Sequence, residues 1–347
     1  MSNRRPEALL TMSNRPPEDR CRPPGRRVPG ARVALVVVLA FVMSCASPTS
    51  ERAGDSPKGR APEATSAADP TEARDSTEAP PAAQAPEAPP AALEPRLVFA
   101  VKGDWGAGTR EQAAVTAQMC RSRQATPFDM VVTTGDNFYN PDGIATQGNY
   151  YRPEACLISH PRHTWRASWG NHDVSGNSTA TVLGAERYYR WSASHVDFFV
   201  LDSNQAADRA QRAWLDAQLR NSRAPVKVAV FHHAPYTVGL HEGNQNVIRN
   251  WVPLFERYGV SLVLTGHNHA YEHSVVNGVH YVITGGGGAR AYPCEEQATW
   301  LLRCLAIHHF LVVEAVGETL SVKAIDATGG EIDAFDIPVG ERVPALP

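Results

Sequence analysis

Five short stretches of the chain carry side chains that bind metal ions, and each ends an apolar run of strand length. They are Gly103-Asp104-Trp105-Gly106, Gly135-Asp136-Asn137-Phe138-Tyr139, Gly170-Asn171-His172-Asp173, His233-Ala234-Pro235 and Gly266-His267-Asn268-His269. The candidate ligands among them are Asp104, Asp136, Tyr139, Asn171, His233, His267 and His269. Seven oxygen and nitrogen donors are more than one tetrahedral ion can use. The pattern therefore predicts a site for two metal ions.

The apolar runs predict the elements that would position these donors. Strands are expected over Leu97 to Val101, Met130 to Thr133, Trp165 to Trp169, Val226 to Phe231 and Ser261 to Leu264. One helix is expected over Ala206 to Asn221, and another along an apolar stripe formed by Val247, Trp251, Leu254, Phe255 and Tyr258. The region from Val312 to Val339, with a turn at Gly329-Gly330, predicts strands that complete a sheet. In layered α/β folds ligands bind beyond the carboxyl ends of strands, so the donors can meet there.

In this order the five stretches resemble the motifs of the calcineurin-like metallophosphoesterases, and within them the purple acid phosphatases of the small tartrate-resistant type. The resemblance covers approximately Leu97 to Gly288. It implies an α/β fold, a four-layer αββα metallophosphoesterase sandwich, with two metal ions at the ends of the sheets. Most members of the superfamily carry a histidine at the position of Gly106, and here Tyr139 supplies a ligand in its place.

The resemblance divides the ligands between two unlike ions. The first ion would take Asp104, Asp136, Tyr139 and His269, and the second would take Asn171, His233 and His267 and share Asp136. Two carboxylates and a phenolate offer three negative charges, which suit Fe³⁺. The mostly neutral second set suits Fe²⁺, Zn²⁺ or Mn²⁺. The His-x-Pro spacing places His233 on the family's ligand position, so His232 is expected to be a packed or solvated neighbour.

A site for two metal ions indicates hydrolytic chemistry. Water that bridges them loses a proton near neutral or acidic pH, which favours hydrolysis by a metal-bound hydroxide. His172 is the first candidate for phosphate binding and proton transfer, and Asp173 could fix its tautomer. The alternative for His172 is a purely structural role. His241 lies about one residue away from the place where the family carries a second acid or phosphate-binding histidine.

The predicted function is an acid phosphatase that hydrolyses phosphate monoesters, with a small-molecule phosphate ester as its substrate. A phosphodiesterase or nucleotide-processing enzyme on the same metal core is the alternative, because the pocket decides which phosphoryl group is accepted. A surface binding protein that keeps the fold without turnover is a third. The basic residues are confined to the start of the chain: residues 1–45 have a net charge of +5 and the remainder −8. This distribution argues against a nucleic-acid partner.

The start of the chain predicts export. A basic lead precedes the apolar run Val33 to Met43, as in a secretory signal, and Val42-Met43-Ser44-Cys45 resembles a bacterial lipobox. Residues 1–45 are thus expected to be a signal peptide, with membrane attachment through a lipidated Cys45 or, alternatively, secretion after cleavage behind Ala46. Residues 46–95, rich in Pro, Ala and Glu, read as a disordered linker, and 96–347 as the catalytic domain.

Four cysteines remain in the predicted domain. A bridge between Cys294 and Cys304 would close a short loop and leave Cys120 to pair with Cys156. An oxidising compartment favours such bridges. Four reduced, partly buried thiols are the alternative.

Overall fold

A computed structural model of the chain describes residues 94–295 and 297–340. The predicted signal peptide and nearly all of the predicted linker lie outside the described residues. The first strand begins at Arg96. No helix in the described part has both the length and the apolar character that a bilayer crossing requires.

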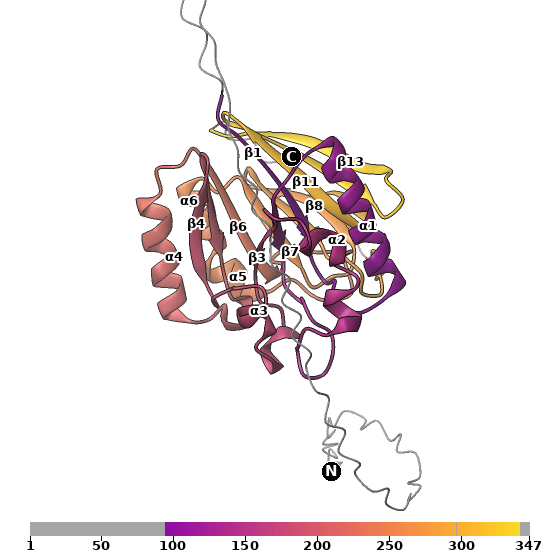
Figure 1. Cartoon of the computed structure of the whole chain (residues 1–347). Helices are drawn as coiled ribbons and strands as arrows, with labels where there is room; N and C mark the ends of the chain where they lie inside the picture. Colours follow the sequence, from indigo (N-terminus) through magenta and orange to yellow (C-terminus); the bar gives the residue numbers. More distant parts are fainter. Residues whose placement is uncertain (1–93, 296, 341–347) are drawn as a thin grey trace, which may run out of the picture. The chain divides into compact units, whose positions relative to one another are not determined.

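Two mixed sheets form the centre of the fold (Figure 1). The first sheet has the strand order β13 (Glu331–Pro338), β12 (Thr319–Asp326), β11 (His309–Val316), β1 (Arg96–Lys102), β2 (Met130–Thr133) and β3 (Thr164–Ala167). The second has the order β10 (Leu301–Leu305), β8 (Tyr271–Val276), β9 (Val279–Thr284), β7 (Leu262–Gly266), β6 (Val226–His233), β5 (Val196–Val200) and β4 (Tyr189–Ala193). β1, β2 and β3 run parallel, as do β5, β6, β7 and β9.

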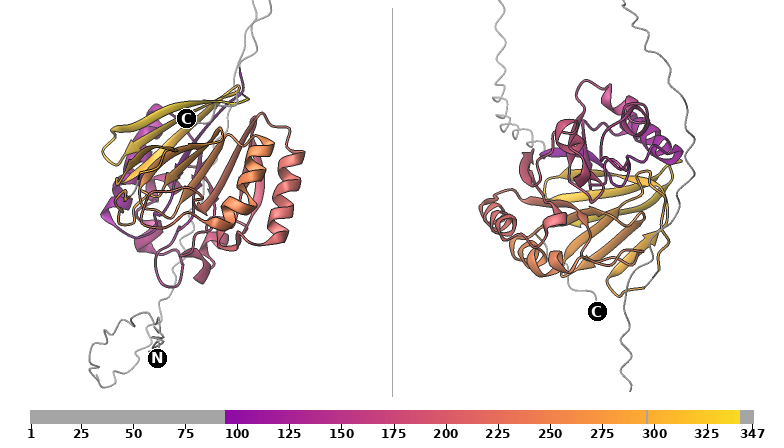
Figure 2. Two further views of the ribbon diagram at one scale, coloured as in Figure 1. Left: turned by 180° about the vertical axis from the view of Figure 1, so that it is seen from behind. Right: turned by 90° about the horizontal axis from the view of Figure 1, so that it is seen from below.

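Helices cover the outer faces of both sheets, as the two views of Figure 2 show. The α-helices are α1 (Arg110–Ala125), α2 (Ala155–Ile158), α3 (Ser178–Thr181), α4 (Arg209–Asn221), α5 (Gln245–Asn250) and α6 (Val252–Tyr258). Shorter helical turns are η1 (Gln147–Tyr151), η2 (Asp173–Ser175) and η3 (Ser203–Gln205). α1 and α2 lie on the side of the first sheet, and α4 and α6 on that of the second. The predicted α/β sandwich of four layers is confirmed.

Three apolar cores hold the layers together. The largest lies between the sheets, where Phe99 of β1 meets Phe198 of β5 with ring centroids 5.1 Å apart. A second core packs β6 and β7 under the helices of the second sheet, and a third packs β1 and β2 under α1. Strand side chains alternate between two of these cores because successive residues point to opposite faces of a sheet.

The predicted helix along the stripe that ends at Tyr258 is interrupted. The structure has two helices, α5 and α6, that meet at Trp251. Pro253 lies in the first turn of α6, where its missing N–H costs no hydrogen bond, whereas it would break a continuous helix. The stripe itself faces the core beside the second sheet, as expected. The strands β11 to β13 complete the first sheet by pairing with β1, also as expected.

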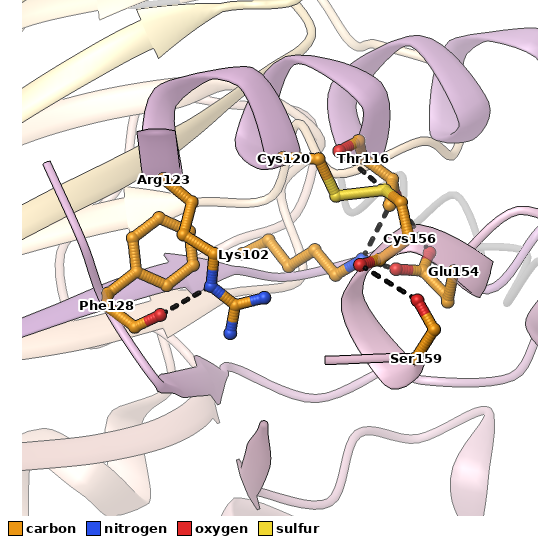
Figure 3. The surroundings of a disulfide bond; sticks show 8 residues. All are labelled: Lys102, Thr116, Cys120, Arg123, Phe128, Glu154, Cys156 and Ser159. Atoms are coloured by element: carbon orange, nitrogen blue, oxygen red, sulfur yellow. Dashed lines mark hydrogen bonds and ion pairs between the residues drawn. A yellow bond between two sulfur atoms is a disulfide. The ribbon is translucent and has the colours of Figure 1, made fainter. Parts of the chain in front are cut away.

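Both predicted disulfides are present. Cys120 pairs with Cys156, and Cys294 pairs with Cys304. The first bridge ties α1 to α2 beside a buried ion pair between Lys102 and Glu154 (Figure 3). Lys102 Nζ lies 2.5 Å from Glu154 Oε2, and both side chains are fully buried. This pair fixes the end of β1, and the first of the five stretches, Gly103-Asp104-Trp105-Gly106, follows at once.

Candidate metal centre

Two glycines of the five stretches, Gly170 and Gly266, stand against the carboxylates of Asp136 and Asp104. A Cβ atom on Gly170 would lie 2.1 Å from Asp136 Oδ1, and one on Gly266 would lie 2.3 Å from Asp104 Oδ2. Any larger residue would push these carboxylates away. The Gly-Asn and Gly-His pairs in the sequence are therefore required for close approach rather than for a turn alone.

Three of the predicted ligands have left-handed backbone conformations. Asp104, Asp136 and His267 have φ angles of 56°, 48° and 72°. Such angles are uncommon for residues other than glycine and cost about 1 to 3 kcal/mol each when the surroundings impose them. The three residues come two, three and one residues after the ends of the parallel strands β1, β2 and β7, so the turn lies at the carboxyl edge of the sheets.

Asp104, Tyr139 and His269 form the first group of donors. The Tyr139 hydroxyl donates to Asp104 Oδ1 at 3.0 Å and lies 2.8 Å from His269 Nε2. His269 Nε2 lies 3.3 Å from Asp104 Oδ1. His269 Nδ1 donates to the carbonyl of Arg290 at 2.7 Å, which leaves Nε2 directed at the other two donors. Separations near 3 Å are those between neighbouring ligands on one ion with bonds of about 2.1 Å.

A second group forms around Asp136. His232 Nε2 lies 3.4 Å from Asp136 Oδ2, 3.1 Å from Asn171 Oδ1 and 3.3 Å from His267 Nδ1. His232 Nδ1 donates to the carbonyl of Thr134 at 2.9 Å, across the gap between the two sheets. The donor atoms of Asp104, Asp136 and His232 all lie within 4.8 Å of one another, so the two groups adjoin.

His232 thus points into the centre, which corrects the expectation that it is only a neighbour. His233 belongs to the same cluster: a ring nitrogen of His233 lies within 4.8 Å of those of His232 and His267, and its Nδ1 is 2.8 Å from the hydroxyl of Ser203. The reason is strand parity. Residues Val226, Val228 and Val230 of β6 face the other sheet, and His232 continues that face.

The charges in the cluster favour a bound cation. Burial acts to lower the pKa of His232, but the charges of Asp136 and Asp104 raise it to about 9. Burial and the positive charge on His232 together lower the pKa of His267 to about 2. Burial and the nearby Asp104 raise the pKa of Tyr139 well above its ordinary value. Without metal ions, a protonated His232 therefore supplies the positive charge that balances these carboxylates. The same donors fit bound metal ions, which would supply that positive charge in place of the proton on His232.

His172 lies at the exposed side of the centre. Its side chain is 46% exposed, its Nε2 is 3.9 Å from Asp136 Oδ2, and its ring is 4.5 Å from that of Tyr139. Asp173 does not hold the imidazole of His172, contrary to the prediction. The Asp173 carboxylate is buried and accepts from the backbone N–H groups of Asn137 and Gly170, at 2.9 and 2.8 Å. It therefore braces the loops that carry Asp136 and Asn171.

His241 also reaches the centre, because a buried amide clamps its loop. The ring of His241 stacks on that of His267 with centroids 4.2 Å apart. Asn268 Oδ1 accepts from His241 N, and Asn268 Nδ2 donates to His241 O, both at 2.9 Å. Asn268 Nδ2 also donates to the hydroxyl of Thr237 at 2.6 Å. His241 is thereby fixed relative to the donors on either side of Asn268.

Sequence reasoning missed a further loop beside the centre. Tyr292 stacks on His269 with ring centroids 4.1 Å apart, and its N–H donates to the His269 carbonyl at 2.9 Å. The Cys294–Cys304 bridge anchors this loop to β10. Tyr292 belongs to no recognisable motif. Asn268 could have been noticed, since it lies inside Gly-His-Asn-His, and His232 could have been found from the parity of its strand.

The sequence pattern described as calcineurin-like phosphoesterase matches residues 97–271. This match spans half of the chain. The chain belongs to the calcineurin-like phosphoesterase family. The predicted family and sandwich are confirmed, and membership supports the predicted metal-dependent phosphohydrolase.

Known proteins that the chain is similar to include two acid phosphatases. Purple acid phosphatase 7 of Arabidopsis thaliana is 29% identical over 56% of this chain and 71% of its own length. Tartrate-resistant acid phosphatase type 5 of Rattus norvegicus is 23% identical over 70% of this chain and 90% of its own length. Among solved structures, "GAP50 the anchor in the inner membrane complex of Plasmodium" has a TM-score of 0.63 at 18% identity, covers 72% of this chain and 90% of its own chain, and shares the fold.

Proposed function

We propose that this chain is an acid phosphatase that hydrolyses phosphate monoesters with two metal ions. The convergence of the donor atoms on Asp136, with the phenol of Tyr139 beside Asp104, carries the proposal. Similarity to the acid phosphatases of Arabidopsis thaliana and Rattus norvegicus supports phosphatase activity over the other activities of the family. When bound, the two ions acidify a water and clamp phosphoryl oxygens during an in-line displacement.

The donors divide between the ions as follows. Asp104, Tyr139 and His269 would hold the first ion, Asn171, His232 and His267 the second, and Asp136 would bridge them. His232, His233 and His267 each offer a donor atom within 4.8 Å of the others. We assign His232 rather than His233 to the second ion because the Nε2 of His232 lies within 3.4 Å of donor atoms of Asp136, Asn171 and His267. The phenolate and carboxylates favour Fe³⁺ at the first position, and the imidazoles and amide favour Fe²⁺, Zn²⁺ or Mn²⁺ at the second.

His172 and His241 are the residues that would handle substrate and protons. They stand on two different loops at the accessible side of the centre. Each can donate a hydrogen bond to a phosphate oxygen, and either can protonate the leaving alcohol, a role worth about 10²- to 10⁴-fold in rate. Asp173 and Asn268 are positioning residues, since they hold the loops and do not face the substrate side.

Export of the protein is part of the proposal. The two disulfides fit an oxidising compartment. Signal cleavage and lipid attachment at Cys45 remain predictions from the sequence, and mass spectrometry of the N-terminal peptide from the native cell envelope would test them.

The test of the proposed function compares an aryl phosphate with a bis-aryl phosphate between pH 4 and pH 8. A monoesterase turns over the first with an acidic optimum and the second far more slowly. Preference for the diester would favour the phosphodiesterase alternative. Two bound metals without hydrolysis of either ester would mean a binding protein on this fold.

A further inference from the structure

Three exposed apolar side chains stand on loops around the metal centre. Ile144, Val174 and Leu240 are 42%, 48% and 49% exposed. Ile144 lies five residues after Tyr139, Val174 lies in the turn that follows His172, and Leu240 directly precedes His241. Single exposed apolar residues are ordinary on a protein surface. Three of them on separate loops that flank one centre are not scattered.

The loops of Ile144 and Val174 pack against each other beside His172. A Cβ on Gly143 would lie 3.0 Å from the His172 carbonyl, and a Cβ on Gly176 would lie 2.2 Å from the Gly143 carbonyl. The backbones are therefore in contact, with no side chain between them. Since the His172 ring adjoins Tyr139, both apolar residues stand at the Tyr139 side of the centre.

Leu240 is held near the second group of donors. Gly239 approaches Asn268 so closely that a Cβ would lie 2.6 Å from its Cγ. The same amide bonds both backbone groups of His241, whose ring stacks on His267. Contacts with Asn268 therefore hold the backbone on both sides of Leu240, and its exposed side chain stands on a loop beside the second group of donors.

The alcohol part of a bound substrate can leave the centre only on its accessible side. Asp104, Asp136 and His232 are at most 2% exposed and close the floor of the centre. His172 and His241 stand at the accessible side. If the phosphate binds at the centre as in the proposed function, on which this inference rests, its alcohol group extends past these two histidines, toward the loops that carry the apolar residues.

The charge of the same loops disfavours a second phosphate group. Residues 140–146, 172–177 and 239–244 contain no Lys or Arg. They carry exposed Asp142 and Glu242. A nucleoside diphosphate would bring its second negative group toward these carboxylates. Arg290 is an exposed cation on the loop beside His269, so polyphosphates are the competing class that an experiment must separate.

We propose that Ile144, Val174 and Leu240 form an apolar subsite for the alcohol part of the substrate, which makes monoesters of apolar alcohols the preferred substrates over nucleoside polyphosphates.

A chain-length series tests this subsite. The kcat/KM values of butyl, hexyl and octyl phosphate, whose leaving alcohols are chemically alike, are measured for the two-metal protein, with ADP as the competing substrate. We expect kcat/KM to rise about two-fold for each added methylene, against about four-fold for a methylene fully removed from water. The octyl ester would then exceed the butyl ester about 15-fold.

Matched variants assign the effect to the three residues. In I144T/V174T/L240N the octyl-to-butyl ratio should fall to within about two-fold of unity. L302N/V316T is the control, because Leu302 and Val316 are similarly exposed but lie on β10 and at the far end of β11. It should keep the full ratio.

Three results would overturn the subsite: a flat series in the parent protein, an unchanged ratio in the triple variant, or a higher kcat/KM for ADP than for octyl phosphate. Calorimetric binding of butyl- and octylphosphonate, which are not hydrolysed, gives the same comparison without turnover. If no ester is hydrolysed but octylphosphonate binds more tightly, the proposed function fails and the subsite stands.

Discussion

Replacing His232 or His233 by alanine separates two adjacent residues with very different predicted roles. His232 Nε2 has three donor atoms of the second group within 3.4 Å, whereas His233 Nδ1 is bonded to the Ser203 hydroxyl at 2.8 Å. His232→Ala therefore removes one of four protein ligands of the second ion. His233→Ala removes a side-chain hydrogen bond worth about 1 kcal/mol of stability.

The two variants should differ by orders of magnitude. Metal stabilisation of transition-state charge is worth several kcal/mol, and about 4 kcal/mol corresponds to roughly 10³-fold in kcat/KM. We expect His232→Ala to lose about that factor together with one bound metal per chain. His233→Ala should keep both metals and lose less than about ten-fold.

Metal analysis and aryl phosphate kinetics on the same preparations check this prediction, with thermal unfolding as the control for misfolding. A His233→Ala protein that loses the second metal, beside a His232→Ala protein that keeps it, would refute the assignment.

Three further predictions follow from buried groups. Asn268→Ala removes the clamp on His241, so kcat should fall at least about ten-fold with metal content unchanged; an unaltered kcat would contradict the positioning role. Lys102→Met leaves Glu154 buried without its cation and should lower the free energy of unfolding, measured in urea, by about 3 to 5 kcal/mol. The double variant Lys102→Met/Glu154→Met should recover much of that loss; an equal loss in the single and double variants would disprove the pairing. Burial lowers the pKa of His309 from 6.5 to about 4, so the unfolded state binds a proton between these values that the folded state does not. Through His309 alone, the free energy of unfolding should fall by roughly 2 to 3 kcal/mol from pH 6.5 to pH 4, and His309→Phe should make the fall smaller by about that amount; an identical slope in the variant would be inconsistent with it.

The sequence predicts the strands and the ligand-bearing turns well, because both depend on local patterns. The apolar runs around Val101, Val132 and Leu264 are buried strands, and each is followed by a turn with a left-handed residue, Asp104, Asp136 or His267, that was proposed as a ligand. The close approach of Gly170 to Asp136 leaves no room for a side chain, so this position requires glycine and the Gly-Asn pair can be recognised in the sequence.

Features that depend on three-dimensional contact are harder to predict. The spacing before Pro235 indicates His233, which lies with His232 and His267 in one group of possible ligands. That His232 also reaches Asp136 depends on which face of β6 meets the other sheet. The sequence predicts that Asp173 orients the imidazole of its neighbour His172. In the structure the Asp173 carboxylate instead accepts hydrogen bonds from the backbone N–H groups of Asn137 and Gly170, and Asn137 is brought near only by the fold. Tyr292 contacts His269 through a disulfide-anchored loop and has no sequence signal.

We propose that Tyr139 is a phenolate ligand in a centre of two unlike ions. Metal analysis with a visible spectrum of the purified protein, repeated for Tyr139→Phe, tests this assignment. We expect two metals per chain, one of them iron, and a visible tyrosinate-to-iron band that the variant lacks. A colourless, fully active protein with two zinc ions would contradict it.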